Sequence, residues 1–379
     1  MSQALRHTAC LSPLATVNPM NKPLALGVLV SAVLGQGVLG QAAPPNYDFQ
    51  WQTIGSPGNT AYHGPDLGGV VTGRGSVPYV YRMARLEVTS TQWVEFANVI
   101  GAIGDPFRIG EDALGGFEGG VTGPNNTYHY SIQGGFPGIG QYPVSRIPWL
   151  NGARYCNWLQ NGKQASLVAL ENGAYDLRAY NADPTSANAG LIHREPGAQF
   201  WIPSIDEWVK AGHFDPNGNG PGQAKWWQYP ITSDTAPVSG VSPLFGGTGQ
   251  TNAALYATNP NTPYQTLLAG AYPAVQSPWG LLDLSGGVSE LLEDRGVFDS
   301  VRYADGSTLY LTDVSTDRVD QFADVGIAGS PYWFGLRIAS AIPTPHTFCG
   351  CIVAIALAHT RRRRSCRDSS PPSCARSSG

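Results

Sequence analysis

Cysteine is almost missing from the body of this 379-residue chain. Of six cysteines, Cys156 alone lies between residues 43 and 342. The others stand near the two ends of the sequence: Cys10, Cys349, Cys351, Cys366 and Cys374. A single cysteine cannot form a disulfide within this region, nor supply the several thiolates of a structural zinc site. The sequence therefore excludes a disulfide framework and a cysteine-based zinc site from its body.

Basic residues are also scarce outside the ends. The whole chain has 23 Lys+Arg against 27 Asp+Glu, a formal net charge of −4. Arg361–Arg364, Arg367 and Arg376 all follow the body, with Asp368 as the one acidic residue among them. Residues 43–342 are therefore much more acidic than the chain as a whole. This charge argues against nucleic acids and anionic membrane surfaces as partners.

Long hydrophobic runs are missing too, and a short one lies near the start. The run Leu24–Leu34 follows Lys22 and precedes Gly40-Gln41-Ala42, the pattern of a signal peptide cleaved after Ala42. It is too short to span a bilayer. We therefore expect residues 1–42 to be a leader, with Met20 as an alternative start, and the protein to be secreted. A cytoplasmic amphipathic start is the other interpretation.

A second short apolar run lies near the other end. Ile342-Pro343-Thr344-Pro345 leads to the run Phe348–Ala358 and then to four arginines, Arg361–Arg364. This order resembles the bacterial exosortase (PEP-CTERM) sorting tail, although Thr344 replaces its glutamate and residues 365–379 extend beyond the arginines. The resemblance implies surface sorting, with the sorting machinery as a partner of residues 343–379. A disordered basic tail is the alternative.

The body is rich in residues that break regular structure. The chain has 47 Gly and 30 Pro beside 10 Trp and 17 Tyr, which is typical of a loop-rich domain held together by buried aromatic rings. No repeat of roughly 20–50 residues is present, so a solenoid or propeller is not expected. Clusters of Asn and Gly at 104–140, 181–190 and 215–223 predict long surface loops.

Four segments predict regular elements. Tyr79–Val88 favours a strand, and Thr89 with Gln92 predicts a helix that opens with a capping box and buries Trp93, Phe96, Ala97 and Ile100. Asn151 is expected to cap a buried helix that carries Cys156. Ser204 and Glu207 predict a second capping box after a short strand at Phe200. Trp333–Ser340 is expected to form a closing strand.

The best-defined motif is Ser277–Asp294, where the apolar run Trp279–Leu284 meets Ser285-Gly286-Gly287. Glycines permit a sharp turn that can aim carbonyls at one point, with Asp283 and Glu290 on either side. Carboxylate and carbonyl oxygens are the ligands that calcium prefers. The simpler interpretation is a strand, a glycine turn and the solvated acidic start of a helix.

Together these five segments resemble the formylglycine-generating enzyme, or sulfatase-modifying factor, family. The matching segments, in order, are Glu87–Phe96 (EVTSTQWVEF), Pro143–Leu159 (PVSRIPWLNGARYCNWL), Trp201–Val209 (WIPSIDEWV), Ser277–Leu291 (SPWGLLDLSGGVSEL) and Gly335–Ala339 (GLRIA). The resemblance implies a loop-rich α+β domain over residues 43–342, similar to C-type lectins, with short helices and little regular secondary structure.

The resemblance also implies structural calcium. It places the side chains of Asp283 and Glu290 and the carbonyls of Gly286 and Val288 on the metal. The chain departs from the family pattern where Gly287 replaces Asn, and where Ser289 and Leu291 replace two tryptophans. Asn252 matches a second calcium site loosely.

The catalytic centre of the family is not matched. Its oxidases bind copper(I) through two nearby cysteines, yet no cysteine follows Arg302–Ser307 (RYADGS), the equivalent region, until Cys349. Thiolates are the soft ligands that copper(I) needs, so neither a copper site nor a catalytic residue is expected. We therefore expect a non-catalytic binding or structural module. An oxidoreductase of the same family that uses a different metal or other residues is the alternative.

Other chemistry finds little support. Ser285 does not indicate a serine protease, because it lies within the motif described above. The glycines of residues 134–140 lack the lysine of a phosphate-binding loop. The seven histidines form no HExxH motif, so a non-haem iron oxidase is not supported either. His129, His193 and His213 are expected in loops or on the surface. Aromatic residues outside the motifs could either stack on an extracellular glycan or peptide or fill the core: Tyr128, Tyr130, Trp226, Trp227 and Tyr229.

Overall fold

The computed structural model describes residues 44–121, 123, 127–135, 138–178, 192–237, 268–295, 301–304, 317–321, 323–325 and 334–342. All of them belong to one compact unit, Gly40–Gly379. The predicted leader, the predicted sorting tail and Asn252 lie outside the described residues, as does the second half of Arg302–Ser307. Within the described ranges, no helix has both the length and the apolar character needed to cross a membrane.

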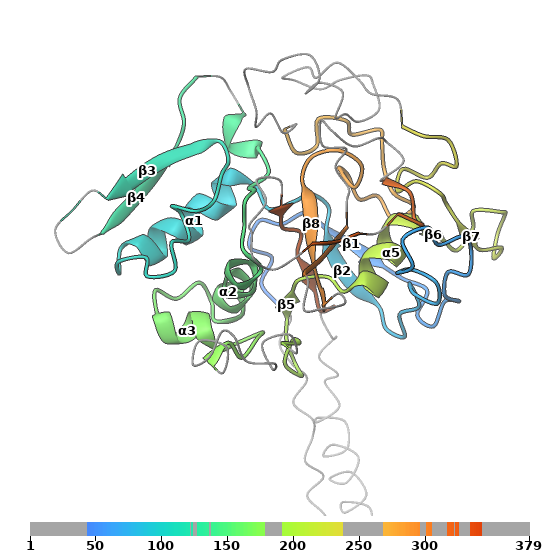
Figure 1. Ribbon diagram of the computed structural model, residues 1–379, viewed down its shortest axis with the longest axis horizontal. Coiled ribbons are helices and arrows are strands. Elements are labelled where there is room, and N and C mark those ends of the chain that lie inside the picture. The colour runs from blue at the N-terminus through green and yellow to red at the C-terminus, as the bar shows by residue number, and fades with distance from the viewer. Residues whose placement is uncertain are drawn as a thin grey trace, which may run out of the picture. The chain divides into compact units, whose positions relative to one another are not determined.

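Two small sheets form the centre of the domain (Figure 1). The first has the order β1-β2-β12-β5, formed by Trp51–Ile54, Tyr81–Ala84, Ala339–Ser340 and Phe200–Trp201, with every neighbouring pair antiparallel. Ala339 lies opposite Met83 on one side and Trp201 on the other. The end of the domain therefore lies between two strands from its first and middle thirds.

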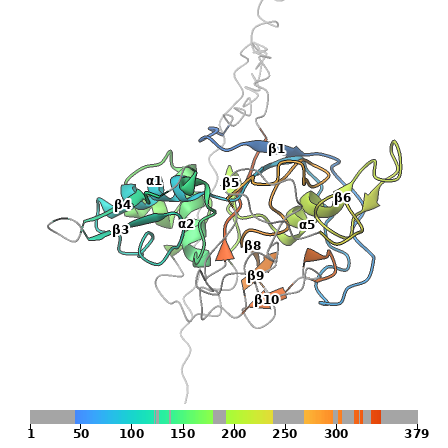
Figure 2. The ribbon, with the colours of Figure 1, turned by 90° about the horizontal axis from the view of Figure 1, so that it is seen from above.

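The second sheet has the order β10-β9-β8-β11, made of Ala323–Val325, Val301–Ala304, Ser289–Arg295 and Phe334–Gly335. Figure 2 shows β8, β9 and β10 side by side. The two-residue strand β11 runs parallel to β8, whereas the other pairs are antiparallel. Two hairpins complete the strands: β3 (Phe117–Val121) with β4 (Tyr128–Ile132), and β6 (Phe214–Asp215) with β7 (Lys225–Trp226).

The helices are short. They are α1 (Ser90–Gly101), α2 (Trp149–Gln160), α3 (Leu167–Glu171) and α5 (Ile205–His213), with the 3₁₀ helix η1 (Ile139–Gln141). Thr89 and Gln92 form the predicted capping box on α1, and Ser204 and Glu207 form the predicted box on α5. These side chains satisfy amide groups that a first helical turn leaves without partners, so both predicted helix starts are confirmed.

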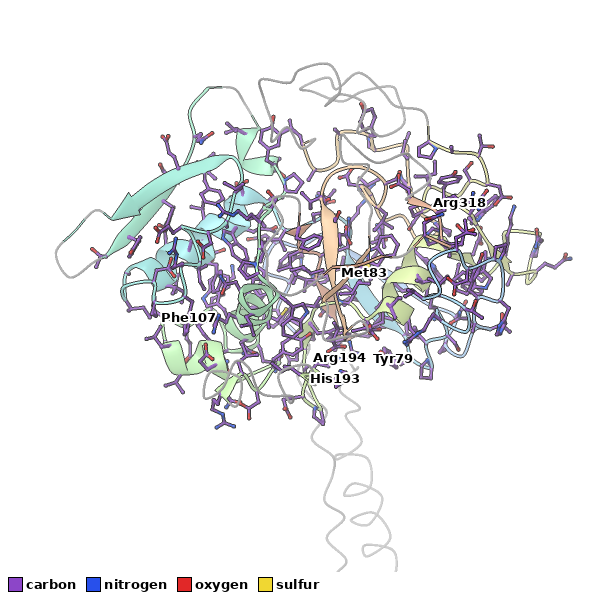
Figure 3. All side chains as sticks on the ribbon, viewed as in Figure 1. Tyr79, Met83, Phe107, His193, Arg194 and Arg318 are labelled. Carbon is purple, nitrogen blue, oxygen red and sulfur yellow. The ribbon has the colours of Figure 1, made fainter. Side chains whose placement is uncertain are left out.

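An aromatic cluster joins α1 to α2. Trp93 and Phe96 on α1 contact Tyr155 and Trp158 on α2, with ring centroids 5.1–5.7 Å apart. All four are buried, as is the whole predicted face of α1. Burying side chains of this size supplies much of the free energy of folding in a domain with few regular elements. Figure 3 shows the side chains that fill the space between the elements.

Several predicted elements differ from the structure. Helix α2 begins at Trp149 after Pro148, so Asn151 lies inside its first turn and its Oδ1 accepts a hydrogen bond from Arg154 instead. Residues 104–140 are not all loop, because they contain the β3–β4 hairpin. The segment Trp333–Ser340, described from residue 334, is divided between β11 and β12.

Two further expectations concern polar residues. The acidic segment after Gly287 is the strand β8 rather than a solvated helix start, and its Glu290 and Glu293 are buried. His213 is the last residue of α5 and is 1% exposed, so its predicted surface position was wrong. The small sheets, short helices and long connections nevertheless confirm the predicted loop-rich α+β class.

Candidate functional site

The glycine turn between the apolar run and β8 is built around a buried carboxylate. Gly286 and Gly287 have φ angles of 90° and 83°, which non-glycine residues rarely adopt. A Cβ on Gly287 would lie 2.4 Å from Oε1 of Glu87, and the amide of Val288 donates a hydrogen bond of 3.0 Å to the same oxygen. The turn therefore needs glycine here because Glu87 occupies the space of a side chain.

Glu290, one of the predicted calcium ligands, has partners at both of its oxygens. Its Oε1 accepts from Nε of Arg337 at 2.7 Å, and its Oε2 accepts from Nε1 of Trp208 at 2.6 Å. Arg337 also donates to the carbonyls of Ala84 and Leu282 at 3.0 and 2.9 Å. Each of the three nitrogens of the guanidinium thus has a partner inside the domain.

Asp283, the other predicted carboxylate ligand, is only partly satisfied. It adopts a φ of 57°, and its Oδ2 accepts from the amide of Gly270. Its Oδ1 is buried and has no hydrogen-bond partner among the described residues. Oε2 of Glu87 is also buried and has no partner in the part of the chain that the structure describes. Burial raises the pKa of Asp283 to about 6, and burial together with the nearby Asp283 raises the pKa of Glu87 well above its usual value.

This cluster, made of Glu87, Asp283, Glu290 and Arg337, does not fit calcium as it stands. A cation at Glu290 would have to displace Arg337, and the described residues contain no group of three or more His, Cys, Asp or Glu side chains arranged to hold a metal ion. Oδ1 of Asp283, which no other described residue contacts by a hydrogen bond, lies beside the turn that carries Gly286 and Val288. Calcium at this turn stays a prediction.

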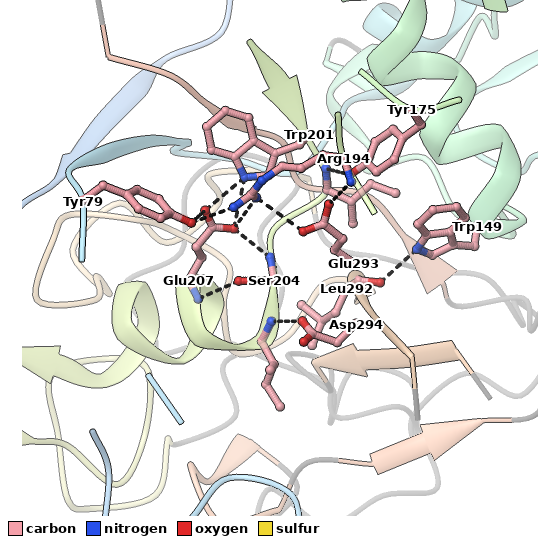
Figure 4. A network of polar contacts seen from close by, with 12 residues as sticks. Tyr79, Trp149, Tyr175, Arg194, Trp201, Ser204, Glu207, Leu292, Glu293 and Asp294 are labelled. Atoms are coloured by element: carbon pink, nitrogen blue, oxygen red, sulfur yellow. Dashed lines mark hydrogen bonds and ion pairs between the residues drawn. The ribbon is translucent and has the colours of Figure 1, made fainter. Parts of the chain in front are cut away.

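A second buried network lies at the start of α5 (Figure 4). Glu207 is 0% exposed and accepts hydrogen bonds from the hydroxyl of Tyr79 (2.8 Å), Nη1 of Arg194 (3.0 Å) and the indole of Trp201. Glu293 on β8 accepts from the amide of Arg194 at 2.8 Å and forms an ion pair with its guanidinium at 3.4 Å. Burial raises the pKa of Glu293 to about 7.

This network joins distant segments rather than presenting free reactive groups. Arg194 lies over the ring of Trp201, 4.4 Å from its centroid, and also donates to the hydroxyl of Tyr79. Figure 3 shows Arg194 and Tyr79 side by side. The carboxylate of Glu207 completes the capping box of α5 as well. Its charge therefore has a structural explanation, as the sequence indicated.

The sequence pointed to some of these residues and missed the role of others. Glu87 and Arg337 both lie in segments that carried the family resemblance, yet nothing local marked them as partners of Asp283 and Glu290. Their signal was a charged residue within an otherwise apolar segment, in Leu-Glu-Val and Leu-Arg-Ile. Arg194 carried no such signal.

The lone cysteine of the body lies in the core. Cys156 is 0% exposed within α2, and burial raises the pKa of its thiol well above the usual value. A thiol in such surroundings stays protonated and behaves as a small apolar side chain.

A comparison with known protein families identifies the family of this chain. The model of the sulfatase-modifying factor enzyme 1-like domain matches residues 75–342, well over half of the chain. The chain belongs to this family. The match includes the turn at Gly286-Gly287, both capping boxes and the Glu290–Arg337 pair. The predicted sulfatase-modifying-factor fold is therefore confirmed.

Solved structures of similar fold have low sequence identity. CarF is 17% identical over 78% of this chain and 99% of its own, with a TM-score of 0.45. Treponema denticola variable protein 1 is 16% identical over 77% and 95%, with a TM-score of 0.41. PvdO from Pseudomonas aeruginosa is 12% identical over 78% and 92%, with a TM-score of 0.34. A comparison with curated proteins gave no match.

Proposed function

We propose that this family member is a non-catalytic binding or structural module of a secreted or surface-sorted protein. The observation that carries the proposal is the distribution of cysteine. No cysteine lies between residues 157 and 348, the part of the chain in which the family resemblance would place a copper-binding pair. Cys156 cannot substitute for that pair, because a buried protonated thiol is a poor ligand for copper(I).

The buried charges support the same proposal. Glu290, Glu207 and Arg337 are each held by two or more partners and are at most 1% exposed. Side chains held in this way cross-link strands and loops and are not accessible to a substrate. The domain would thus act as a rigid support for surface loops.

The test is an oxidation assay on the purified full chain. The protein is incubated with copper(I), oxygen and a peptide that contains a sulfatase-type cysteine, and the peptide is analysed by mass spectrometry. A family member that carries the cysteine pair serves as the positive control. We expect the thiol to remain unmodified, and conversion of the cysteine to an aldehyde would overturn the proposal.

The alternative, an oxidoreductase that uses another metal, is addressed by metal analysis of the same preparation. Stoichiometric iron or copper in the purified protein would favour this enzyme. The calcium prediction is checked separately by measuring the melting temperature with calcium and with a chelator. Equal melting temperatures under the two conditions would contradict the prediction that calcium binds at the turn at Gly286-Gly287.

Secretion rests on the pattern of residues 1–42 and surface sorting on residues 343–379. N-terminal sequencing of the exported protein is expected to begin at Ala43. Intact-mass measurement of the same material reports whether the tail has been removed. A protein that stays in the cytoplasm with its leader intact would contradict the proposed localisation.

A further inference from the structure

Asparagine is followed directly by glycine at five positions of the chain: Asn151, Asn161, Asn172, Asn217 and Asn219. In such a pair the main-chain nitrogen of the glycine can attack the asparagine side chain with little hindrance, because glycine carries no side chain of its own. The two groups must also be free to meet. All five pairs lie within the described residues, so the structure shows which of them are held apart.

The two pairs at the ends of α2 are protected by hydrogen bonds. Asn151 is buried, and the amide of Gly152 donates to the carbonyl of Pro148 at 3.1 Å. Asn161 caps the other end of the helix, where its Nδ2 donates to three main-chain carbonyls. The amide of Gly162 also donates to a carbonyl of the helix at 3.1 Å. These amides cannot react until their hydrogen bonds break.

The two pairs in the loop between β6 and β7 are exposed, yet their side chains are also held. Oδ1 of Asn217 accepts from the amide of Gly222 at 2.8 Å, and Nδ2 of Asn219 donates to the carbonyl of Ala224 at 3.0 Å. The amide of Gly220 donates to the carbonyl of Asn217 at 2.9 Å. Each side chain must leave its partner before it can turn towards the next nitrogen.

Asn172 differs from the other four. It is exposed directly after α3, and neither its side-chain amide nor the main-chain nitrogen of Gly173 has a hydrogen bond to another described residue. The peptide has to rotate from a ψ of 126° before this nitrogen reaches Cγ. One exposed hydrogen bond of 2.8 Å, from Nδ2 of Asn161 to the carbonyl of Asn172, holds the peptide.

We propose that Asn172 is a site of spontaneous deamidation. The nitrogen of Gly173 forms a bond to Cγ of Asn172, and the side-chain nitrogen leaves as ammonia with the proton of the Gly173 amide. Water then opens the five-membered imide at either of its two carbonyls, which gives aspartate or isoaspartate. The reaction needs no metal, ligand or oxidant, so its test is independent of the proposed function.

Both products change the charge at this end of α3. Each adds a carboxylate beside Glu171, whose own carboxylate accepts from Nε of Arg154 at 2.7 Å. The added charge lies at the carboxyl end of the helix, where the helix dipole disfavours an anion. Deamidation therefore makes an already acidic domain more negative at a defined place.

Isoaspartate also lengthens the main chain directly before Gly173. This glycine fits closely, because a Cβ on it would lie 2.8 Å from Nδ2 of Asn161 and 3.1 Å from Oδ1 of Asn157. Asn157 accepts from the amide of Tyr175 at 2.7 Å and donates to its carbonyl at 2.9 Å. A longer main chain disturbs these contacts, so we expect α3 to be held less firmly on α2 in the aged protein.

The experiment is incubation of the purified full chain at neutral and mildly alkaline pH, followed by digestion and site-resolved mass spectrometry. We expect Asn172 to react at least about five-fold faster than the other four asparagines, because each additional hydrogen bond that must break slows the reaction by about this factor. In urea the five pairs should react at similar rates. Equal rates at Asn172 and Asn219 in the folded protein, or an intact Asn172 after the unfolded chain has reacted, would overturn the proposal.

Two variants connect the reaction to the structure. Asn172→Gln replaces an exposed side chain without a partner among the described residues, so it should fold normally and remove the fast reaction. Asn219→Gln is the matched control and should leave the rate at Asn172 unchanged. After the same incubation, the melting temperature of the natural protein should fall, and that of Asn172→Gln should not. An equal fall in both proteins would show that the loss of stability arises elsewhere and would contradict the proposed effect on α3.

Discussion

Arg337 and Glu290 form an ion pair inside the domain, with Nη2 of the arginine 2.6 Å from Oε1 of the glutamate and side chains 0% and 1% exposed. Because Arg337 also donates to the carbonyls of Ala84 and Leu282, one guanidinium connects the closing segment with β8, β2 and the loop before the glycine turn. Its positive charge also opposes the effect of burial, which raises the pKa of Glu87 and of Asp283 nearby.

Removing the arginine alone should be severe. We expect Arg337→Met to lower the free energy of unfolding by roughly 3–5 kcal/mol, because it leaves a buried carboxylate without its partner. The double variant Arg337→Met with Glu290→Gln should recover part of that loss. Urea denaturation measures both, and a single-variant loss below about 1 kcal/mol would show that the pair is not structural.

Gly287→Ala tests the contact with Glu87. A Cβ there lies 2.4 Å from Oε1 of Glu87, while Gly58, with a similar φ of 74°, has nothing within 4 Å of its Cβ position. Both substitutions carry the strain of a positive φ, of the order of 1 kcal/mol. We expect Gly287→Ala to destabilise the protein clearly more than Gly58→Ala does. Equal losses in thermal melts would mean that Glu87 moves aside without cost.

Two buried tyrosines differ in whether their hydroxyl has a partner. The hydroxyl of Tyr81 donates to the carbonyl of Glu207 at 2.5 Å, whereas that of Tyr130 has no partner within the described ranges. We expect Tyr81→Phe to cost about 1–2 kcal/mol, and Tyr130→Phe to stay within about 0.5 kcal/mol of the natural protein or above it. Chemical denaturation decides, and a large loss in Tyr130→Phe would reveal a structural role for its hydroxyl.

Glu293 should make stability fall as the pH rises. Burial raises its pKa in the folded protein to about 7, above the ordinary value of 4.5 in the unfolded chain. The folded state therefore holds an extra proton between these values, and the contribution present below pH 4.5 is lost as the pH approaches 7. Compared with Glu293→Gln, the natural protein should lose up to about 1.4 kcal/mol per pH unit in this window. Parallel pH profiles would refute the shift.

His213 should act in the opposite direction. Its ring is buried, with Nδ1 3.0 Å from the carbonyl of Trp227, and burial lowers its pKa from 6.5 to about 3. Only the unfolded state takes up the proton as the pH falls below 6.5, so stability decreases from there towards pH 3. His213→Gln can still donate to the carbonyl and should lose this part of the acid sensitivity. Unchanged acid unfolding in the variant would show that the pKa of His213 is not lowered in the folded protein.

Helix starts that depend on neighbouring residues could be predicted from the sequence. The capping boxes at Thr89 and Ser204 were readable because each uses residues three positions apart. The start of α2 was not, because tertiary contacts set it: the indole of Trp149 donates to the carbonyl of Leu292, and the amide of Ile147 donates to the carbonyl of Phe334. These contacts place the first turn two residues before Asn151.

The contacts of the candidate site were harder to predict, because they join segments that are far apart in the sequence. Asp283, Gly286 and Glu290 could be selected from one motif, but Glu87 meets Val288 from 201 residues away and Arg337 meets Glu290 from 47. A strand rich in carboxylates was misread as a solvated helix start because its counter-charges, Arg194 and Arg337, lie on other segments. Sequence patterns show which residues carry charge, and only the fold shows which charges neutralise one another.

The position of β12 has a consequence for synthesis. Ala339 and Ser340 pair with β2 on one side and β5 on the other, so the middle of the first sheet is the last part of the domain to leave the ribosome. Until then β2 and β5 lack the strand that separates them, and a nascent chain exposes two unpaired edges. A fold closed by such distant contacts forms slowly and only after translation of the whole domain is complete. Shortening the gene by even the few codons for β12 would therefore remove the centre of this sheet.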